Sequence, residues 1–366
     1  MSTIKKHARF LSILMALLLL TTLAAPVFAA EEADEDPYKA VELAKLLAES
    51  VKIPEDGTAD NTLDWLVFVL SLDSPYRQAL PEIAEKYPEY VKACAETSKE
   101  DKPGDLTRWL LALRSVQGRK AQFEVADGLL ERLLAKDFAK EDATNAIAYT
   151  LFTLDAYKAG DDELRETLRG ILTAAQREDG GYNWQLKPGP EDASDPDTTA
   201  AVITALARYR EDEKAENQKI RPVVEKALEY LKSAQLESGG FGMFGDSAES
   251  AAEVLIAHSA LGLDTKTEDW QNEWSKGGKS VIDAMQGFRL ESQAVKGGSD
   301  GSANTYAGVR VLLALTAISF QGNVYDFVAP TAINIFLTDN YMYIVIGLVS
   351  IGAVAAVIYL SRKKKA

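Results

Sequence analysis

Two carboxylates lie two residues apart near the middle of the chain, in the run Asp195-Pro196-Asp197-Thr198. A carboxylic acid that burial and a nearby negative charge keep protonated can donate a proton in catalysis. Asp197 is therefore a candidate general acid. The alternative is structural, because an aspartate ahead of an apolar run can cap a helix by accepting its free backbone N–H groups. The sequence favours this capping role for Asp195 or Asp197.

The stretch around these acids occurs twice, which indicates which residues belong to its architecture. Gln176 to Tyr209 and Gln235 to Leu261 share a helix end, a Gly-Gly-aromatic turn, an acidic loop and an apolar helix. An internal repeat is stronger evidence of fold than any single motif. The pairs that we expect are Gln176 with Gln235, Gly180 with Gly239, Gly181 with Gly240, Asp195 with Asp246, and Thr199 with Ser250. In this alignment Asp197 faces Ala248 and lies outside the repeat.

Aromatic residues accompany both turns. Tyr182, Trp184, Phe241 and Phe244 lie in the loops beside glycines, which let backbone segments approach closely. Aromatic rings of this kind make good contacts at the edge of a ligand cavity, so we predict ligand-binding roles for them, with loop packing as the alternative. Tyr306 is a further ligand-binding candidate. Like Trp65 and Trp109 it lies early in an apolar helix, where core packing is the favoured role.

The elements that position these residues are helices. From Tyr38 onward apolar residues recur at i, i+3, i+4 and i+7, which is typical of an all-helical protein. Helix start and stop residues predict about twelve helices, at roughly 38–52, 61–72, 78–96, 105–116, 122–135, 142–157, 162–176, 197–210, 220–236, 247–262, 277–290 and 303–319.

Alternate helices differ in character. The second, fourth and following even-numbered helices are apolar nearly all round, which indicates burial on every face, whereas the odd-numbered helices are amphipathic. Six hairpins of one outer and one inner helix predict an all-α (α/α)6 toroid over 38–327. An open solenoid of helix pairs is the competing architecture, although the polar capping repeats that it needs are not evident.

Both ends of the chain carry targeting signals. Residues 1–29 combine three cations, an apolar run and small residues, as a cleaved signal peptide does. An acidic spacer follows at 30–37. Residues 341–360 have no charge and would form a membrane helix about 30 Å long. Residues 361–366 form a basic tail that we expect in the cytoplasm. The toroid would then lie on the extracytoplasmic side of the cell membrane, on a single-pass anchor joined by a juxtamembrane linker at 328–340.

Charge narrows the range of partners. The chain has 40 Lys and Arg against 55 Asp and Glu, a net charge of −15. Seven of the cations lie in the two end segments, so the part between them is more acidic still. Such a surface repels phosphate backbones, and we expect no nucleic-acid partner. The single cysteine, Cys94, excludes an intramolecular disulfide.

The Gln-x-x-x-Gly-Gly-aromatic turn followed by an Ala-rich helix resembles the prenyltransferase/squalene oxidase repeat of the terpenoid cyclase and protein prenyltransferase toroids. It is similar to bacterial surface proteins with this repeat, whose fold is like the α-domain of cobalamin carriers such as intrinsic factor. The resemblance is strong over 163–327 and implies a toroid. Relatives that hold zinc use Asp, Cys and His, but this chain offers only Cys94 and His258 in its central part, so no metal and no cofactor are predicted.

The same resemblance raises the question of whether the protein is a cyclase-like enzyme or a binding module. Class II cyclases protonate an alkene with the middle acid of Asp-x-Asp-Asp, and Asp195-Pro196-Asp197-Thr198 lacks the last acid. We therefore predict a membrane-anchored, non-catalytic module that binds a ligand or partner: an apolar small molecule, a cobalamin-like ligand or a surface glycan. A terpene cyclase-like enzyme with Asp197 as its acid is one alternative. A structural adaptor of an envelope membrane complex is the other.

Overall fold

The computed structural model describes residues 38–50, 52–54, 57–72, 81–98, 100–116, 120–211, 219–297 and 301–326. The predicted signal peptide, spacer, juxtamembrane linker, membrane helix and basic tail all lie outside these residues. Within the described ranges, no helix combines the length and the apolar character needed to cross a bilayer. All helices of these ranges belong to one compact unit that begins at Ala40.

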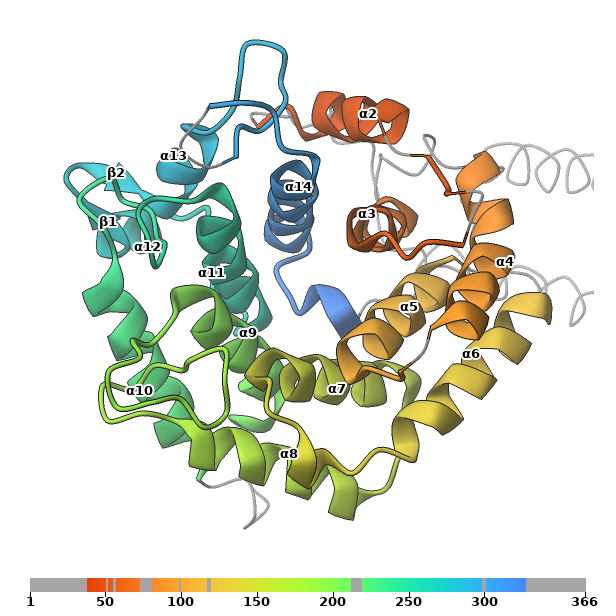
Figure 1. Cartoon of the computed structure of the whole chain (residues 1–366). Helices are drawn as coiled ribbons and strands as arrows, with labels where there is room; N and C mark the ends of the chain where they lie inside the picture. Colours follow the sequence, from red (N-terminus) through yellow and green to blue (C-terminus); the bar gives the residue numbers. More distant parts are fainter. Residues whose placement is uncertain are drawn as a thin grey trace, which may run out of the picture. The chain divides into compact units, whose positions relative to one another are not determined.

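Six inner helices form a closed ring, drawn in Figure 1. Each contacts the next in chain order, and the last returns to contact the first. An open solenoid, whose terminal helices do not meet, is thereby excluded, and the predicted α/α toroid is confirmed. The inner helices are α3 (Asn61–Ser71), α5 (Pro103–Ser115), α7 (Thr144–Tyr157), α9 (Pro196–Leu206), α11 (Ala248–Ala260) and α14 (Thr305–Phe320).

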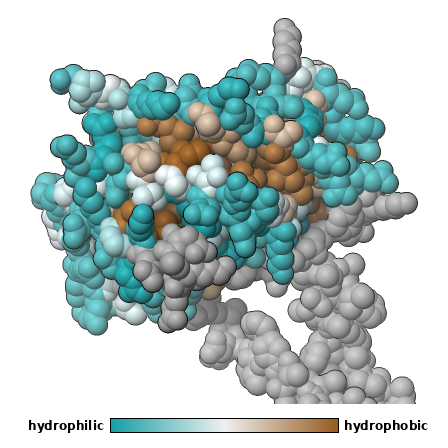
Figure 2. All heavy atoms as spheres, turned by 90° about the horizontal axis from the view of Figure 1, so that it is seen from below, coloured by the Kyte–Doolittle hydropathy of each residue, from teal (hydrophilic) through white to brown (hydrophobic). Residues whose placement is uncertain are grey.

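Outer helices surround the ring, and burial separates the two layers as the sequence pattern predicts. In α9 every residue except Asp197 is buried, whereas α8 buries only Leu168, Arg169 and Leu172. Figure 2 shows hydrophilic residues over most of one side of the molecule, around an apolar area. The outer helices are α2 (Ala40–Ser50), α4 (Pro81–Thr97), α6 (Lys120–Leu134), α8 (Asp162–Ala175) and α10 (Ile220–Ala234).

The sixth outer position differs from the single helix expected at 277–290. Two short helices, α12 (Glu268–Glu273) and α13 (Val281–Gln286), flank an antiparallel ribbon of β1 (Ser275–Lys276) and β2 (Lys279–Ser280). Gly277 and Gly278 form its turn with φ of 57° and 78°. A two-residue strand is too short to show an alternating pattern, so the sequence gives no signal of this ribbon.

The repeated Gly-Gly-aromatic turns are built alike. The Gln176 side chain donates to the carbonyl oxygens of Gly180, at 2.9 Å, and Val223, at 2.8 Å. The Gln235 side chain donates in the same way to Gly239, at 2.8 Å, and Trp274, at 2.9 Å. Each glutamine therefore ties its own turn to the next outer element of the toroid.

Glycine is required in these turns by conformation and by space. Gly180 and Gly239 have φ of 90° and 83°. A Cβ on Gly180 would clash with the carbonyl oxygen of Lys226, and one on Gly239 with that of Lys279. The second glycines, Gly181 and Gly240, have negative φ but press against Ser194 and Asp246.

The acidic loops align one residue differently from the predicted pairing. The Asp195 N–H donates to the Tyr182 carbonyl at 2.7 Å, and the equivalent bond to Phe241 comes from Ser247, at 2.9 Å. Asp195 and Ser247 are also the N-caps of α9 and α11. The predicted pairs of Asp195 with Asp246 and Thr199 with Ser250 are therefore wrong. Asp195 matches Ser247, Asp197 matches Glu249, and Thr199 matches Ala251. The first loop is longer than the second, which leaves the register undefined from sequence.

The C-terminal ends of the inner helices are closed by a short 3-10 helix, η5 (Val324–Asp326), which contacts α7, α11 and α14. The Tyr325 ring stacks on Phe152 of α7, with centroids 4.4 Å apart, and on Phe68 of α3, at 5.6 Å. The described chain thus ends inside the ring, at the end opposite the helix N-termini.

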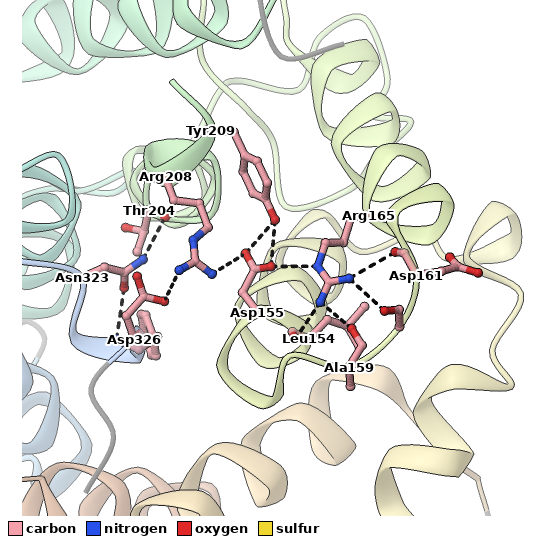
Figure 3. A network of polar contacts seen from close by, with 12 residues as sticks. Leu154, Asp155, Ala159, Asp161, Arg165, Thr204, Arg208, Tyr209, Asn323 and Asp326 are labelled. Carbon is pink, nitrogen blue, oxygen red and sulfur yellow. Dashed lines mark hydrogen bonds and ion pairs between the residues drawn. The ribbon is translucent and has the colours of Figure 1, made fainter. Parts of the chain in front are cut away.

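A polar network, shown in Figure 3, fastens η5 to α7 and to the segment after α9. The buried Asp155 carboxylate accepts from Tyr209 Oη at 2.8 Å and Arg165 Nε at 3.0 Å, and Arg208 Nη1 lies 3.3 Å away. Arg208 also pairs with Asp326 at 3.4 Å. This network joins the last described residues to α7, to the outer helix α8 and to the segment after α9.

Two glycine substitutions separate conformational strain from steric clash. Gly239→Ala and Gly278→Ala both place alanine at a positive φ, which costs about 1–2 kcal/mol, but only a Cβ on Gly239 meets backbone atoms. We expect Gly239→Ala to lower the free energy of unfolding by about 1–3 kcal/mol more than Gly278→Ala. Urea unfolding of the full-length variants measures both values, and equal losses would contradict the close packing of this turn.

Candidate functional site

Four inner helices carry an amide, carboxylate or phenol side chain at their second residue, at the same end of the ring. These residues are Asn145 of α7, Asp197 of α9, Glu249 of α11 and Tyr306 of α14. Residues four positions later lie on the same helix face, one turn deeper. The deeper positions hold Tyr149, Glu253 and Arg310, together with Trp65 of α3 and Arg108 of α5.

A cavity of about 870 Å³ opens at the N-terminal ends of α3, α5, α7 and α14. Its size falls within the range of small-molecule sites. Trp65, Tyr149 and Tyr306 line it with aromatic rings, and Asn145 and Arg108 line it with polar groups. The remaining wall comes from loop residues at 100–102 and 136–143 and from the first turns of these helices.

Arg108 holds the α3 and α5 walls of the cavity together. Its Nε lies 2.7 Å from Asp64 Oδ2, and its Nη2 lies 2.8 Å from Asp105 Oδ1. The Tyr87 hydroxyl of α4 donates to the other Asp64 oxygen at 2.7 Å. Burial raises the pKa of Asp64 to about 6, although Arg108 and the Tyr87 hydrogen bond oppose the shift. The wall is therefore a hydrogen-bonded unit of three helices.

Arg310 lies on α14 one turn after the cavity-lining Tyr306 and is buried, with 1% exposure. One of its terminal nitrogens, Nη2, pairs with Glu253, and its guanidinium carbon lies 4.9 Å from the centre of the Trp65 ring. Its Nε and Nη1 have no hydrogen-bond partner. Unpaired donors on a buried cation are costly, so Arg310 retains unused hydrogen-bonding capacity inside the ring.

Of the two helix caps that the sequence offered, Asp195 and Asp197, the structure confirms Asp195. The Asp195 carboxylate caps α9 by accepting from the N–H groups of Asp197 and Thr198. Asp197 instead has one buried oxygen, Oδ1, with no hydrogen-bond partner. Burial raises its pKa to about 6, and Asp195 and Glu249 add to the shift, while a Ser250 hydrogen bond and Arg310 oppose it. Asp197 is therefore half protonated near pH 6 and mostly ionised at pH 7.

Tyr306 connects Asp197 to the cavity. It lines the cavity wall, whereas Asp197 and Glu249 are not among the lining residues. Burial raises the pKa of Tyr306 to about 12, and the charges of Tyr325, Asp197 and Glu249 contribute. The carboxyl pair on α9 and α11 thus lies within electrostatic range of a cavity residue.

The other four predicted ligand contacts occupy different environments. Tyr182 and Phe241 are fully buried, so the rim position that the sequence predicted for them is wrong. Their backbones pair with the caps of α9 and α11, which draws both rings inward. Trp184 and Phe244 are 56% and 98% exposed. Neither lines the cavity, but the Trp184 carbonyl accepts from Thr144, next to the lining residue Ala143.

Several residues of the site were not predicted from sequence. Asn145, Tyr149, Arg108, Glu253 and Arg310 belong to it, and the last two carried a usable signal. A charged residue in the middle of a helix that is otherwise apolar on all faces needs a partner inside the protein. Glu253 and Arg310 are such residues on two adjacent inner helices.

The cavity wall is acidic and shows no metal-binding arrangement. Across the described ranges, no three His, Cys, Asp or Glu side chains are placed to hold a metal ion. Acids outnumber bases among the lining residues: Glu100, Asp101, Asp105, Asp137, Glu141 and Asp142 against Lys102, Arg108, Lys136 and Lys140. Anionic ligands are disfavoured by such a wall.

No family model matches the chain, and no curated protein matches it. Solved structures do match the chain. One is an unsaturated glucuronyl hydrolase from Bacillus sp. GL1, described as responsible for the degradation of glycosaminoglycan. It has a TM-score of 0.55 and 14% identity, over 79% of this chain and 97% of that one.

A second similar structure is described as an asparagine-for-aspartate variant of UGL with the saccharide dGlcA-Glc-Rha-Glc. Its TM-score is 0.56 and its identity 14%, with the same coverage of both chains. At this identity the likeness shows a shared fold and carries no activity with it. The toroid implied by the family resemblance is confirmed, whereas its prenyltransferase and squalene cyclase-like part is not.

Proposed function

We propose that the protein binds a saccharide in the cavity at the N-terminal end of the inner ring. The observation that supports this most directly is the lining, where Trp65, Tyr149 and Tyr306 alternate with hydrogen-bonding side chains in about 870 Å³. Sugar rings present C–H faces to aromatic rings and hydroxyl edges to polar groups, so they match both kinds of wall.

The polar part of the lining separates this proposal from the other expected ligands. Asn145 Oδ1 is buried without a hydrogen-bond partner and belongs to a cavity-lining residue. An isoprenoid would leave this oxygen and the charged wall without partners, at the cost of desolvating them. This counts against a terpene cyclase-like role. No feature of the cavity singles out a cobalamin-like ligand.

Charge and location define the class of saccharide. The acidic wall favours neutral or cationic sugars over uronates. The sequence signals of export and of a single membrane anchor lie outside the described residues, and we retain them as part of the proposal. The ligand would then be a glycan met at the cell surface.

Calorimetric titration of the full-length chain with hexamers of glucosamine, N-acetylglucosamine and galacturonate tests the proposal. We expect binding of the cationic and neutral hexamers and the weakest binding of the anionic one. Asn145→Ala should weaken the tightest complex by about tenfold, since it removes one ligand hydrogen bond. Asp246→Ala, at an exposed loop position, is the control for a change outside the cavity. Absence of binding by all three hexamers would refute a saccharide site.

Hydrolysis of a glycosidic bond is the second candidate, because Asp197 has the raised pKa that a general acid needs. Asp197 and Glu249 occupy the same position of adjacent inner helices. In an inverting hydrolysis Asp197 would protonate the leaving glycosidic oxygen as the C–O bond breaks. Glu249 would take a proton from the water that adds to the sugar carbon.

Release of reducing ends from a bound hexamer tests this second candidate. A hydrolase should lose activity by about 100-fold or more in Asp197→Asn, because general acid catalysis contributes at least that factor. The affinity for the hexamer should change little, because asparagine has nearly the same shape as a protonated aspartic acid and keeps its hydrogen-bonding groups. If the wild type binds hexamers but releases no reducing ends from them, hydrolysis is refuted and the binding proposal stands.

The protonation of Asp197 can be measured without a ligand. Its folded pKa of about 6 lies above the ordinary value of 3.8, so the folded protein binds this proton more tightly than the unfolded chain. Asp197 therefore adds stability below about pH 4 that is lost as the pH rises through about 6. Asp197→Asn should be up to about 3 kcal/mol more stable than wild type near pH 8, and the two should converge near pH 4.

Urea unfolding at a series of pH values gives both stability curves. Asp246→Asn, which also removes one negative charge but at an exposed residue, controls for net charge. Parallel curves for the wild type and Asp197→Asn would contradict a raised pKa at Asp197.

A further inference from the structure

The loop that carries Trp184 is bonded to the cavity wall by several hydrogen bonds. The Thr144 N–H donates to the Trp184 carbonyl at 2.9 Å, and its hydroxyl donates to the Asn183 carbonyl at 2.7 Å. The Leu186 N–H donates to the Asp142 carbonyl at 2.8 Å. Asp142 and Ala143 line the cavity, so the backbone of Trp184 lies next to its rim.

The same loop is also braced from within. The buried Asn183 donates through Nδ2 to the Ala193 carbonyl at 2.6 Å and accepts through Oδ1 from the Gln185 N–H at 3.0 Å. These bonds fix the backbone on both sides of Trp184. The tryptophan is therefore presented on a rigid support, which lowers the entropy lost when a ligand contacts it.

Trp184 is far more exposed to solvent than any other tryptophan of the chain. Its exposure is 56%, whereas Trp65, Trp109, Trp270 and Trp274 are at most 6% exposed. A large aromatic side chain that is more than half exposed to water gains free energy when a ligand covers it. A rigid exposed indole next to a cavity that offers aromatic and polar groups has the chemistry of a stacking platform for a sugar ring.

We propose that Trp184 forms a second saccharide subsite outside the cavity, so that the ligand is an oligosaccharide that continues from the cavity onto the Trp184 ring. This inference rests on the proposed saccharide-binding function and specifies its substrate class as a chain rather than a single sugar. The Trp184 subsite contacts only units beyond those held in the cavity. Its contribution therefore depends on ligand length.

Calorimetry with glucosamine oligomers of two to six units, on the full-length chain, tests the subsite. Trp184→Ala should weaken binding of the hexamer by about three- to tenfold, the range for one aromatic contact, and leave binding of the dimer unchanged. Trp184→Phe should recover part of the loss. Phe244→Ala is the matched control, because Phe244 is also exposed but belongs to the loop before α11, which does not line the cavity.

Acrylamide quenching of tryptophan fluorescence gives a second readout. The hexamer should protect the wild type from quenching, the dimer should not, and Trp184→Phe should show no length-dependent protection. Equal affinities of wild type and Trp184→Ala for the hexamer would overturn the subsite and leave the proposed function intact. Equal losses for dimer and hexamer would also overturn it. Failure of the wild type to bind any oligomer would overturn both proposals.

Discussion

The rest of this structure depends on one constraint, that the six inner helices are buried on nearly every face. A buried helix side has no water to satisfy polar side chains, so such groups must pair internally or lie at a helix end. The ring directs all six N-termini to one mouth, where the first turns have access to solvent. Asn145, Asp197, Glu249 and Tyr306 are polar because they occupy those turns. The site is thus a consequence of the architecture as well as of particular residues.

Two ion pairs satisfy this rule by pairing internally, one turn deeper in the ring. Arg310 with Glu253, and Arg108 with Asp64, place charges where apolar packing would be neutral or more stable. Buried pairs of this kind contribute little net stability, and their retention in a ring of Ala, Leu and Val points to specificity. Arg310 also contacts the Trp65 face, which fixes an aromatic ring of the cavity wall. The two pairs therefore hold two residues of the cavity wall, Arg108 and Trp65, in place.

The sequence predicted the toroid and the repeated turns because their determinants are local. Gln176 and Gly180 act within five residues of each other, and the helix periods are read over single helices. The site depends on pairs that are distant in sequence, such as Glu253 with Arg310, and on register across loops of unequal length. A shift of one residue in the alignment of the two repeats changed the counterpart of Asp197 from Ala248 to Glu249. Tyr182 and Trp184 are two residues apart and look equivalent, yet one is buried and the other exposed, which depends on the contacts of their loop.

The closure of the C-terminal end of the ring by η5 has a geometric consequence for attachment. Asp326 lies at the C-terminal end of the inner ring, where it pairs with Arg208. The Tyr325 ring points from there into the ring, between Phe152 and Trp65. Whatever is joined to the chain after Asp326, a reporter, a solid support or a natural tether, therefore starts from the base of the toroid. If the protein is immobilised through this end, the cavity mouth faces away from the attachment. Long ligand chains can then enter the cavity from the open side.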